Sequence, residues 1–254
     1  MKRLIVKPTS ELAATIALCL LFATPWVSAE EELSESPWRG NTKLGFIFTQ
    51  TTTSSLSVNT GATVVHDKED WQQRGEFSTY YTNAPEGEDG TNKYNLTYGV
   101  KHQVNGEWFV YGNNKYEHDQ YATYRQQMTI ATGFGATLLD LERRKLSIGA
   151  GPGYRFSQRQ DFDPDFPGKK EDEIIANAFV EGMAKINDRF ELGGKLSTDY
   201  GEANTSTNVK GYVKNQLMQA VSLQLDLEYI YNTEVASDQS NDEIYSTISL
   251  NYDF

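Results

Sequence analysis

Residues that could carry out catalysis are sparse in this sequence. Histidines occur at His66, His102 and His118, but none is accompanied by a Gly-x-Ser-x-Gly elbow or a His-x-Ser pair that would supply an activated serine. There is no Walker sequence and no His-Glu-x-x-His motif, and the one cysteine is Cys19. We therefore expect no enzymatic activity, no catalytic residue and no cofactor, and we expect the histidines to be interface-placed residues at strand ends.

One acidic stretch superficially matches a calcium-binding loop. Asp161, Asp163 and Asp165 alternate with other residues, and Asp172 follows eleven residues after the first of them. Calcium loops of this kind need glycine at the sixth position for a sharp turn, whereas this chain has Phe166 there. We expect a solvated acidic loop and no metal site.

Charged side chains that alternate with apolar ones are the most informative set. In an extended segment every second side chain points to the same face, so these charges share one face while the apolar residues take the other. Unpaired charge is costly in a narrow space, so we expect these residues to pair, either as a plug or along a small aqueous pore. The expected lumen residues are Lys43, Arg74, Glu76, Lys101, Arg125, Arg155, Glu181, Glu191, Lys195, Lys210, Lys214, Asp226 and Glu228.

About twelve β-strands must position these charges, because period-two alternation recurs along the chain and no segment shows a convincing helical period. The long connections, at about 83–92, 158–172 and 232–242, all follow odd-numbered strands, as in barrels whose two termini are periplasmic. The expected strands are 38–50, 56–64, 71–81, 93–101, 108–117, 121–136, 146–156, 173–186, 189–198, 209–214, 221–229 and 244–254.

Two local patterns refine this arrangement. Asn105-Gly106 predicts a two-residue hairpin. The faces of the following strand stay open: a strict two-residue turn puts Tyr111 and Lys115 outward, whereas a one-residue bulge turns them inward. A glycine row on one face of the segment 146–156 leaves room for large neighbouring side chains; its members are Gly149, Gly151 and Gly153.

The fold class expected from these patterns is all-β, a transmembrane antiparallel up-and-down β-barrel of about twelve strands. Only 38% of the residues are hydrophobic, but a barrel hides its lipid-facing residues by alternating them with polar ones. A secreted soluble β-sandwich is the alternative, but it explains neither the loop asymmetry nor the aromatic residues near strand ends. These aromatic residues are Trp38, Trp71, Tyr81, Trp108 and Tyr252.

The two ends of the chain carry export and assembly patterns. Basic residues, an apolar run from Leu12 to Ala23 and a small-x-small site predict a signal peptide at 1–29, followed by an acidic leader at 30–37 and the barrel at 38–254. A terminal aromatic residue preceded by apolar residues at every second position resembles the assembly signal of outer-membrane barrels; its residues are Ile248, Leu250, Tyr252 and Phe254. The expected partners are the barrel assembly machinery, outer-membrane lipid and lipopolysaccharide. The net charge of −12 argues against nucleic acid, and we expect a monomer.

The chain resembles the family of salt-induced outer-membrane proteins, the YdiY-like group whose domain has no known function. The resemblance covers about 38–254, and the opening strand departs from it by passing from Phe48 into a Thr/Ser run. It implies an outer-membrane barrel and an association with salt or osmotic stress, but no reaction and no catalytic residue. The motifs that carry it are Trp38-Arg39-Gly40, the stretch Trp108 to Asn113 leading to Asp119, Thr132-Gly133-Phe134-Gly135, the stretch Gly149 to Tyr154, and Tyr252-Asp253-Phe254.

The function expected is that of a narrow, porin-like channel or a structural envelope protein of a Gram-negative outer membrane. Acidic residues in the long loops predict a mouth with a weak preference for cations; they are Glu86, Glu88, Asp89, Asp161, Asp163, Asp165, Glu234, Asp238 and Asp242. A barrel enzyme that modifies lipid or lipopolysaccharide is the alternative, and it would need a pocket joining one histidine to a serine and a carboxylate.

Overall fold

The computed structural model describes residues 36–50, 54–83 and 91–254, and Pro37–Phe254 form one compact unit. The expected signal peptide and most of the acidic leader lie outside the described residues, as do Glu86, Glu88 and Asp89. Among the described residues, no helix is long and apolar enough to cross a membrane.

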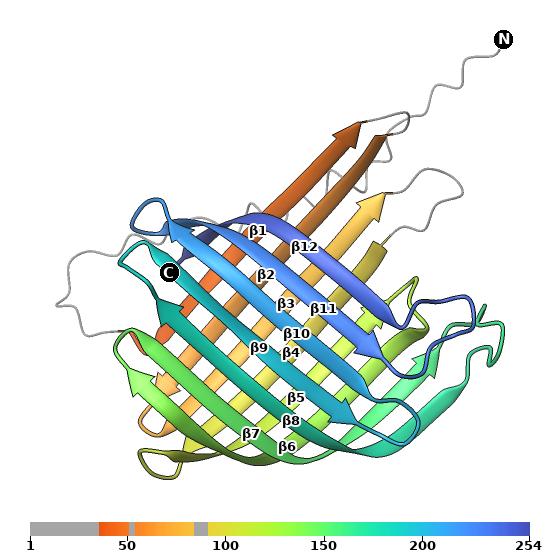
Figure 1. Cartoon of the computed structure of the whole chain (residues 1–254), viewed down its shortest axis with the longest axis horizontal. Coiled ribbons are helices and arrows are strands. Elements are labelled where there is room, and N and C mark those ends of the chain that lie inside the picture. Colours follow the sequence, from red (N-terminus) through yellow and green to blue (C-terminus); the bar gives the residue numbers. More distant parts are fainter. Residues whose placement is uncertain (1–35, 51–53, 84–90) are drawn as a thin grey trace. The chain divides into compact units, whose positions relative to one another are not determined.

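The described residues form twelve strands that close into one antiparallel barrel, with each strand paired to its neighbours in sequence and β1 paired to β12 (Figure 1). A single closed sheet of this kind excludes the two-sheet sandwich. The strands are β1 Trp38–Gln50, β2 Ser54–Lys68, β3 Trp71–Asn83, β4 Thr91–Gln103, β5 Trp108–Asp119, β6 Tyr124–Leu141, β7 Arg144–Arg159, β8 Lys170–Lys185, β9 Phe190–Tyr200, β10 Ser206–Gln216, β11 Val221–Asn232 and β12 Asp242–Asp253.

The connections at the two ends of the barrel differ in length, as the sequence predicts. At one end, called the turn end below, only two to four residues join β2 to β3, β4 to β5, β6 to β7, β8 to β9 and β10 to β11. At the other, called the loop end, residues 160–169 join β7 to β8 and residues 233–241 join β11 to β12. Strand β6 runs five residues beyond its expected end at Ala136, so the charged turn that follows it shrinks to two residues, 142 and 143.

The polarity of the barrel is the reverse of that of a soluble protein. Large apolar side chains on the outer face are exposed, including Phe134 at 71% and Ile174 at 79%, whereas Arg155 and Arg159 are buried inside. An apolar outer surface of this extent needs an apolar surrounding phase, because soluble proteins rarely expose large contiguous apolar patches. The alternation therefore places polar side chains toward the lumen and apolar ones toward lipid.

The turn at Asn105-Gly106 is not the expected two-residue hairpin. Four residues, 104–107, separate β4 from β5, and the Asn105 side-chain oxygen accepts hydrogen bonds from the backbone N–H groups of Glu107 and Trp108. The asparagine thus stabilises a longer turn through its own side chain. The resulting register turns Tyr111 inward, since its hydroxyl donates to Asn177 of β8 at 2.8 Å, and Lys115 shares this face.

The first strand and the chain terminus meet at the first and last motifs of the resemblance. The backbone N–H of Gly40 donates to the Phe254 carbonyl at 2.8 Å, and that of Phe254 donates to the Gly40 carbonyl at 2.9 Å. A β-carbon at Gly40 would lie 2.7 Å from the Phe254 ring, so glycine is what allows the ring to pack there. This contact joins β1 to the chain terminus.

Gly149 has the role expected for the glycine row of β7, whereas a β-carbon at Gly151 would meet only backbone atoms. A β-carbon at Gly149 would lie 2.5 Å from the Phe179 ring and 3.2 Å from the Tyr111 ring. The Phe109 ring occupies the same position over Gly135 of β6. The glycines therefore make room for an aromatic layer in the lumen, formed by Phe109, Tyr111 and Phe179.

We expect Gly149→Ala to lower the free energy of unfolding by about 1–3 kcal/mol, because the new methyl group would overlap the Phe179 ring. The measurement is urea unfolding of the refolded barrel, followed by heat-modifiable gel migration. Gly99→Ala is the matched control, because its nearest neighbour atom would lie 3.7 Å away. Combining Gly149→Ala with Phe179→Ala should recover part of the loss, and equal stability of Gly149→Ala and the control would contradict the packing.

Candidate functional site in the charged lumen

The structure places most of the expected lumen residues on the inner face of the barrel. Their strand registers and their contacts across the lumen agree with the predicted alternation. The residues found there are Lys43, Arg74, Glu76, Lys101, Arg155, Glu181, Glu191, Lys195, Lys210, Lys214, Asp226 and Glu228.

Arg125 is the exception, and its expected lumen position is wrong. The register of β6 against β7 shifts between Tyr124 and Gln126, so Tyr124 faces inward, where its ring lies under the Arg159 guanidinium. Arg125 turns outward to Asp161, at 3.0 Å in an exposed ion pair. A β-bulge re-aims side chains in this way, and no residue pattern predicted it.

A buried lysine forms the centre of the charge network. Lys93 of β4 is 6% exposed and lies 3.9 Å from Asp119 of β5 and 3.8 Å from Glu243 of β12. Its ammonium group also lies 5.0 Å from the centre of the Tyr245 ring. A lysine this buried requires such compensation, because an isolated buried charge is too costly.

A second lysine connects strands on different sides of the lumen. Lys210 of β10 lies 3.2 Å from Glu228 of β11, which also accepts a hydrogen bond from Asn208 at 2.6 Å. Lys210 interacts electrostatically with Glu76 of β3 and with Glu117 of β5 as well. Because β10 is not a neighbour of β3 or β5 in the sheet, these last two interactions act across the lumen rather than along its wall.

Two further ion pairs skip a strand. Lys43 of β1 lies 3.4 Å from Asp226 of β11, and Lys214 of β10 lies 2.8 Å from Asp253 of β12. Each pair passes over the strand between its partners. These two pairs therefore follow the inner wall, whereas Lys93 of β4 and Glu243 of β12 span part of the lumen.

The aromatic layer adds a second obstruction. The ammonium group of Lys101 lies 3.9 Å from the centre of the Phe109 ring, and that of Lys195 lies 5.0 Å from the centre of the Phe179 ring. Cation–π contacts of this kind hold a lysine over an aromatic face. Tyr111 completes the layer through its hydrogen bond to Asn177.

Loops fold together at the loop end of the barrel. Arg159, at the end of β7, lies 2.9 Å from Asp163 and 3.3 Å from Glu234 of the β11–β12 connection. The backbone N–H of Ala236 donates to the Thr123 hydroxyl at 3.0 Å, and that of Ser237 donates to Asp165 at 2.9 Å. The connections after β5, β7 and β11 are therefore tied into one assembly, called the loop cap below.

The calcium-like loop is a part of this cap. One carboxylate oxygen of Asp163 accepts hydrogen bonds from the backbone N–H groups of Asp165 and Phe166, and the other is paired with Arg159. These donors occupy the lone pairs that a cation would need. Within the described part of the chain, no group of three or more His, Cys, Asp or Glu residues could hold a metal ion.

The three histidines stack on aromatic rings of the outer face. His66 lies 4.3 Å from Trp38, His102 lies 4.3 Å from Trp71, and His118 lies 4.7 Å from Tyr94, all between ring centres. Trp38 and Trp71 begin their strands at the turn end, whereas His118 lies toward the loop end. The histidines therefore lie beside aromatic rings on the outer face, and their role at an interface stays a prediction.

Several lumen residues were missed by the sequence analysis. Lys93 shares the face of Lys101 and could have been found from the alternation. Lys115, Glu117 and Tyr111 could not, because the faces of their strand stayed open until the turn at 104–107 was known.

The fold is a closed antiparallel barrel, and similar barrels occur among solved outer-membrane proteins. The NanC porin aligns with a TM-score of 0.50 and 11% identity over 84% of this chain and 97% of its own. The translocator domain of the autotransporter NalP from Neisseria meningitidis aligns with a TM-score of 0.49 and 11% identity over 96% and 98% of the two chains. The KdgM porin in complex with disordered oligogalacturonate aligns with a TM-score of 0.42 and 8% identity over 85% of this chain and 99% of its own.

The family follows from the sequence match. Residues 42–254 match the family described as protein of unknown function, DUF481, and the chain belongs to this family. No curated protein sequence matches the chain significantly. The family match thus agrees with the unknown-function family of the resemblance, and the NanC porin shares its barrel fold. None of the proteins named here supports the salt-induced naming.

Asp163 makes the loop cap sensitive to acid. Burial by itself raises the pKa of the Asp163 carboxyl, but the N–H groups of Phe166 and Asp165 and the Arg159 guanidinium outweigh it and hold the pKa below its ordinary value. A lowered pKa means that the stabilisation is complete above the ordinary aspartate range and is lost as the pH falls through the lowered pKa.

We expect Asp163→Asn to reduce the hydrogen-exchange protection of the Asp165 and Phe166 amides at neutral pH by roughly tenfold or more, since bonds to a charged acceptor are lost. Wild-type protection should fall only at pH values below the ordinary aspartate range. Asp161→Asn is the matched control, because that carboxylate is exposed in its pair with Arg125. Unchanged protection in Asp163→Asn would show that the cap does not depend on this carboxylate.

Proposed function

We propose that this protein is a monomeric, narrow, charge-lined channel of a Gram-negative outer membrane, with a weak preference for cations at its mouth. The observation that carries the proposal is the set of ion pairs that join non-adjacent strands inside a closed barrel with an apolar outer face. The porin-like fold supports a channel or an envelope protein, and the geometry of the lumen favours a small conductance over an open pore.

The charges of the lumen favour transport of small ions over large solutes. Lys93, Lys210 and their carboxylate partners line the lumen, where the Lys210 side chain is still 49% exposed, so a passing solute must exchange part of its water for these fixed charges. Ions can do so by replacing one partner of an ion pair, whereas a bulky neutral solute cannot. If the network never opens, the same barrel serves as a structural envelope protein.

The preference for cations should be weak. Asp161 pairs with Arg125, and Asp163 and Glu234 both pair with Arg159, so these loop carboxylates are partly compensated. Asp238 and Asp242 add further negative charge to the same end of the barrel. The mouth therefore has a smaller excess of negative charge than the loop sequences alone suggest.

The outer membrane is the proposed location, and its lipid and lipopolysaccharide are the proposed surroundings. Phe46, Phe134 and Ile174 are among the outer-face side chains that would contact lipid. The barrel assembly machinery is a proposed partner, through the terminal signal that ends in Phe254. Induction by salt stays a separate proposal, which transcript levels measured at low and high osmolarity would test.

We expect the refolded chain to give small, discrete conductance steps in a planar bilayer. Lys210→Gln should enlarge the steps and shift the reversal potential in a salt gradient toward cation selectivity, because Glu228, Glu76 and Glu117 would lose a compensating charge.

Arg125→Gln is the matched control for this experiment, because it removes one positive charge from the outer surface rather than the lumen. Equal effects of the two substitutions would argue against the lumen network as the conducting path. A folded barrel that never conducts would favour the structural envelope role.

We expect Phe254→Ala to reduce the amount of folded barrel in the outer membrane several-fold in cells, because the assembly machinery would lose the terminal aromatic residue. The purified, refolded variant should stay nearly as stable as the wild type, since the hydrogen bonds between residues 40 and 254 use the backbone alone. Phe162→Ala, which removes an exposed aromatic side chain from a loop, is the control. A loss of stability equal to the loss of assembly would contradict a signalling role.

A further inference from the structure

The junction between β1 and β12 is paired over only part of its length. Five residue pairs join the two strands, from Asn41 with Asp253 to Gly45 with Ser249. Beyond Gly45, the backbone of β1 continues to Gln50 paired with β2, and the backbone of β12 from Asp242 to Ile248 is paired with β11. In the described backbone, neither of these two stretches pairs across the junction, and Figure 1 shows β1 and β12 diverging there.

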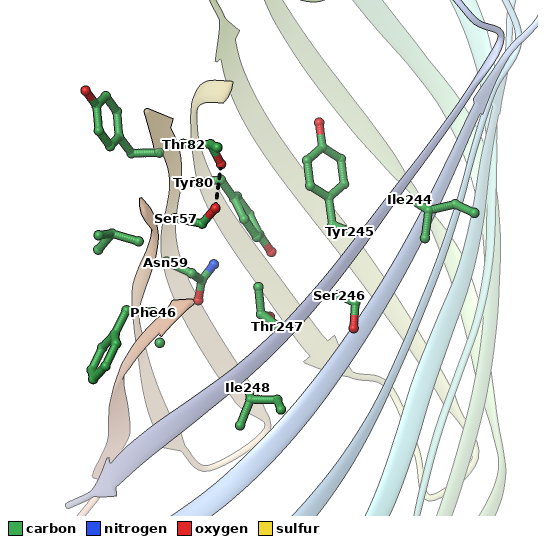
Figure 2. A pocket seen from close by; sticks show the side chains of 13 residues that line it. Phe46, Ser57, Asn59, Tyr80, Thr82, Ile244, Tyr245, Ser246, Thr247 and Ile248 are labelled. Atoms are coloured by element: carbon green, nitrogen blue, oxygen red, sulfur yellow. Dashed lines mark hydrogen bonds between the residues drawn. The ribbon is translucent and has the colours of Figure 1, made fainter. Parts of the chain in front are cut away.

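A cavity of about 260 Å³ lies at this gap, bounded by β1, β2, β3 and β12 (Figure 2). Its outward part is apolar, with Phe46 68%, Ile244 67% and Ile248 54% exposed. Its inward part is polar, with Asn59 and Tyr80 on one side and Tyr245 on the other. The cavity is larger than the roughly 150 Å³ cavity that accommodates benzene in a protein core.

The inward part contains an unsatisfied acceptor. Asn59 is 4% exposed, and its side-chain N–H group donates to the Thr79 carbonyl at 3.4 Å. Its side-chain oxygen is buried and has no hydrogen-bond partner among the described residues. A buried acceptor without a donor is destabilising, so this oxygen favours a ligand that donates a hydrogen bond.

Two tyrosine rings in contact with each other lie beside the position that such a ligand would occupy. The rings of Tyr80 and Tyr245 lie 5.2 Å apart between centres, on strands that face each other across the gap. The Tyr245 hydroxyl donates to Glu243 at 2.6 Å, which places a carboxylate near the polar part of the cavity. The Lys93 ammonium lies 3.8 Å from that carboxylate and compensates its charge, so the acceptor-rich surrounding favours a neutral hydroxyl group.

We propose that the gap between β1 and β12 is a lateral opening of the barrel wall, which binds an amphiphile with one alkyl chain and a hydroxyl head. The alkyl chain lies along Phe46, Ile244 and Ile248 on the lipid side. The head enters the wall and donates a hydrogen bond to Asn59, next to the contacting rings of Tyr80 and Tyr245. This inference rests on the proposed position of the barrel in a membrane.

The experiment uses a long-chain fatty alcohol with a photoactivatable diazirine next to its hydroxyl group, in phosphatidylcholine vesicles that contain the full-length barrel. Labelled residues are mapped by mass spectrometry. We expect labels on inward residues of the cavity, Asn59, Tyr80 and Tyr245, in addition to labels on outward residues such as Ile248. Tyr111, on the inner face away from the cavity, gives the background.

Closing the opening should abolish the inward labels. Phe46→Cys with Ile248→Cys, in a chain whose Cys19 is replaced by serine, extends the existing register by one pair and locks the gap when oxidised. Leu44→Cys with Leu250→Cys is the matched control, because these residues are already paired. Inward labelling should fall to the Tyr111 level only in the oxidised Phe46/Ile248 variant and return on reduction.

A second variant tests the head-group contact without altering the gap. Asn59→Leu removes the acceptor, so labels on Tyr80 and Tyr245 should disappear while those on Ile248 persist. If the Phe46/Ile248 pair does not oxidise although the Leu44/Leu250 pair does, the gap is held open and cannot be locked. The Asn59→Leu variant then tests the proposal: labels on Tyr80 and Tyr245 that persist in it would contradict the head-group contact.

The outcomes separate this inference from the proposed function. Outward labels without inward ones, or inward labels that survive the lock, would overturn the lateral opening and leave the membrane barrel intact. Cross-links between two copies through Phe46→Cys would show instead that the free edge pairs with a second copy. Absence of labels on every outward residue would reject the membrane position itself.

Discussion

Closure of the backbone hydrogen-bond ring is the constraint on which the rest of this structure depends. A sheet in an apolar phase cannot leave an edge unpaired, because no water satisfies its N–H and C=O groups. The chain meets this demand by joining its first and last motifs, with Gly40 and Phe254 exchanging two backbone hydrogen bonds. Once the ring is closed, side-chain alternation decides what faces lipid and what faces the lumen.

The lumen inherits its chemistry from that closure. Twelve strands leave little room inside, and every inward position that is not glycine must share it. The chain fills the space in two ways: aromatic rings pack over glycines, as Phe179 does over Gly149, and charges of opposite sign pair between strands, as Lys210 does with Glu228. Both arrangements restrict passage, and the second also gives the lumen fixed charges that an ion can exchange with.

The same constraint makes the β1–β12 junction the most informative irregularity. Pairing there stops after five residues, while β1 pairs with β2 along its whole length. Backbone groups that lack sheet partners, an apolar outer rim and a buried acceptor at Asn59 occur together at this one place. Their coincidence distinguishes the gap from ordinary fraying at a strand end, because fraying alone would not leave a polar pocket on the inner side.

The sequence by itself determined the barrel, because period-two alternation fixes which side chains share a face whatever the neighbouring strand is. It therefore predicted the strands, most of the lumen charges such as Lys43 and Glu228, and the role of one glycine in the row of β7. Only the tertiary structure decided the irregular features. The bulge that turns Arg125 outward, the longer turn that brings Tyr111 inward and the gap beside Phe46 all depend on register between strands, and register is set by contacts between residues far apart in the chain.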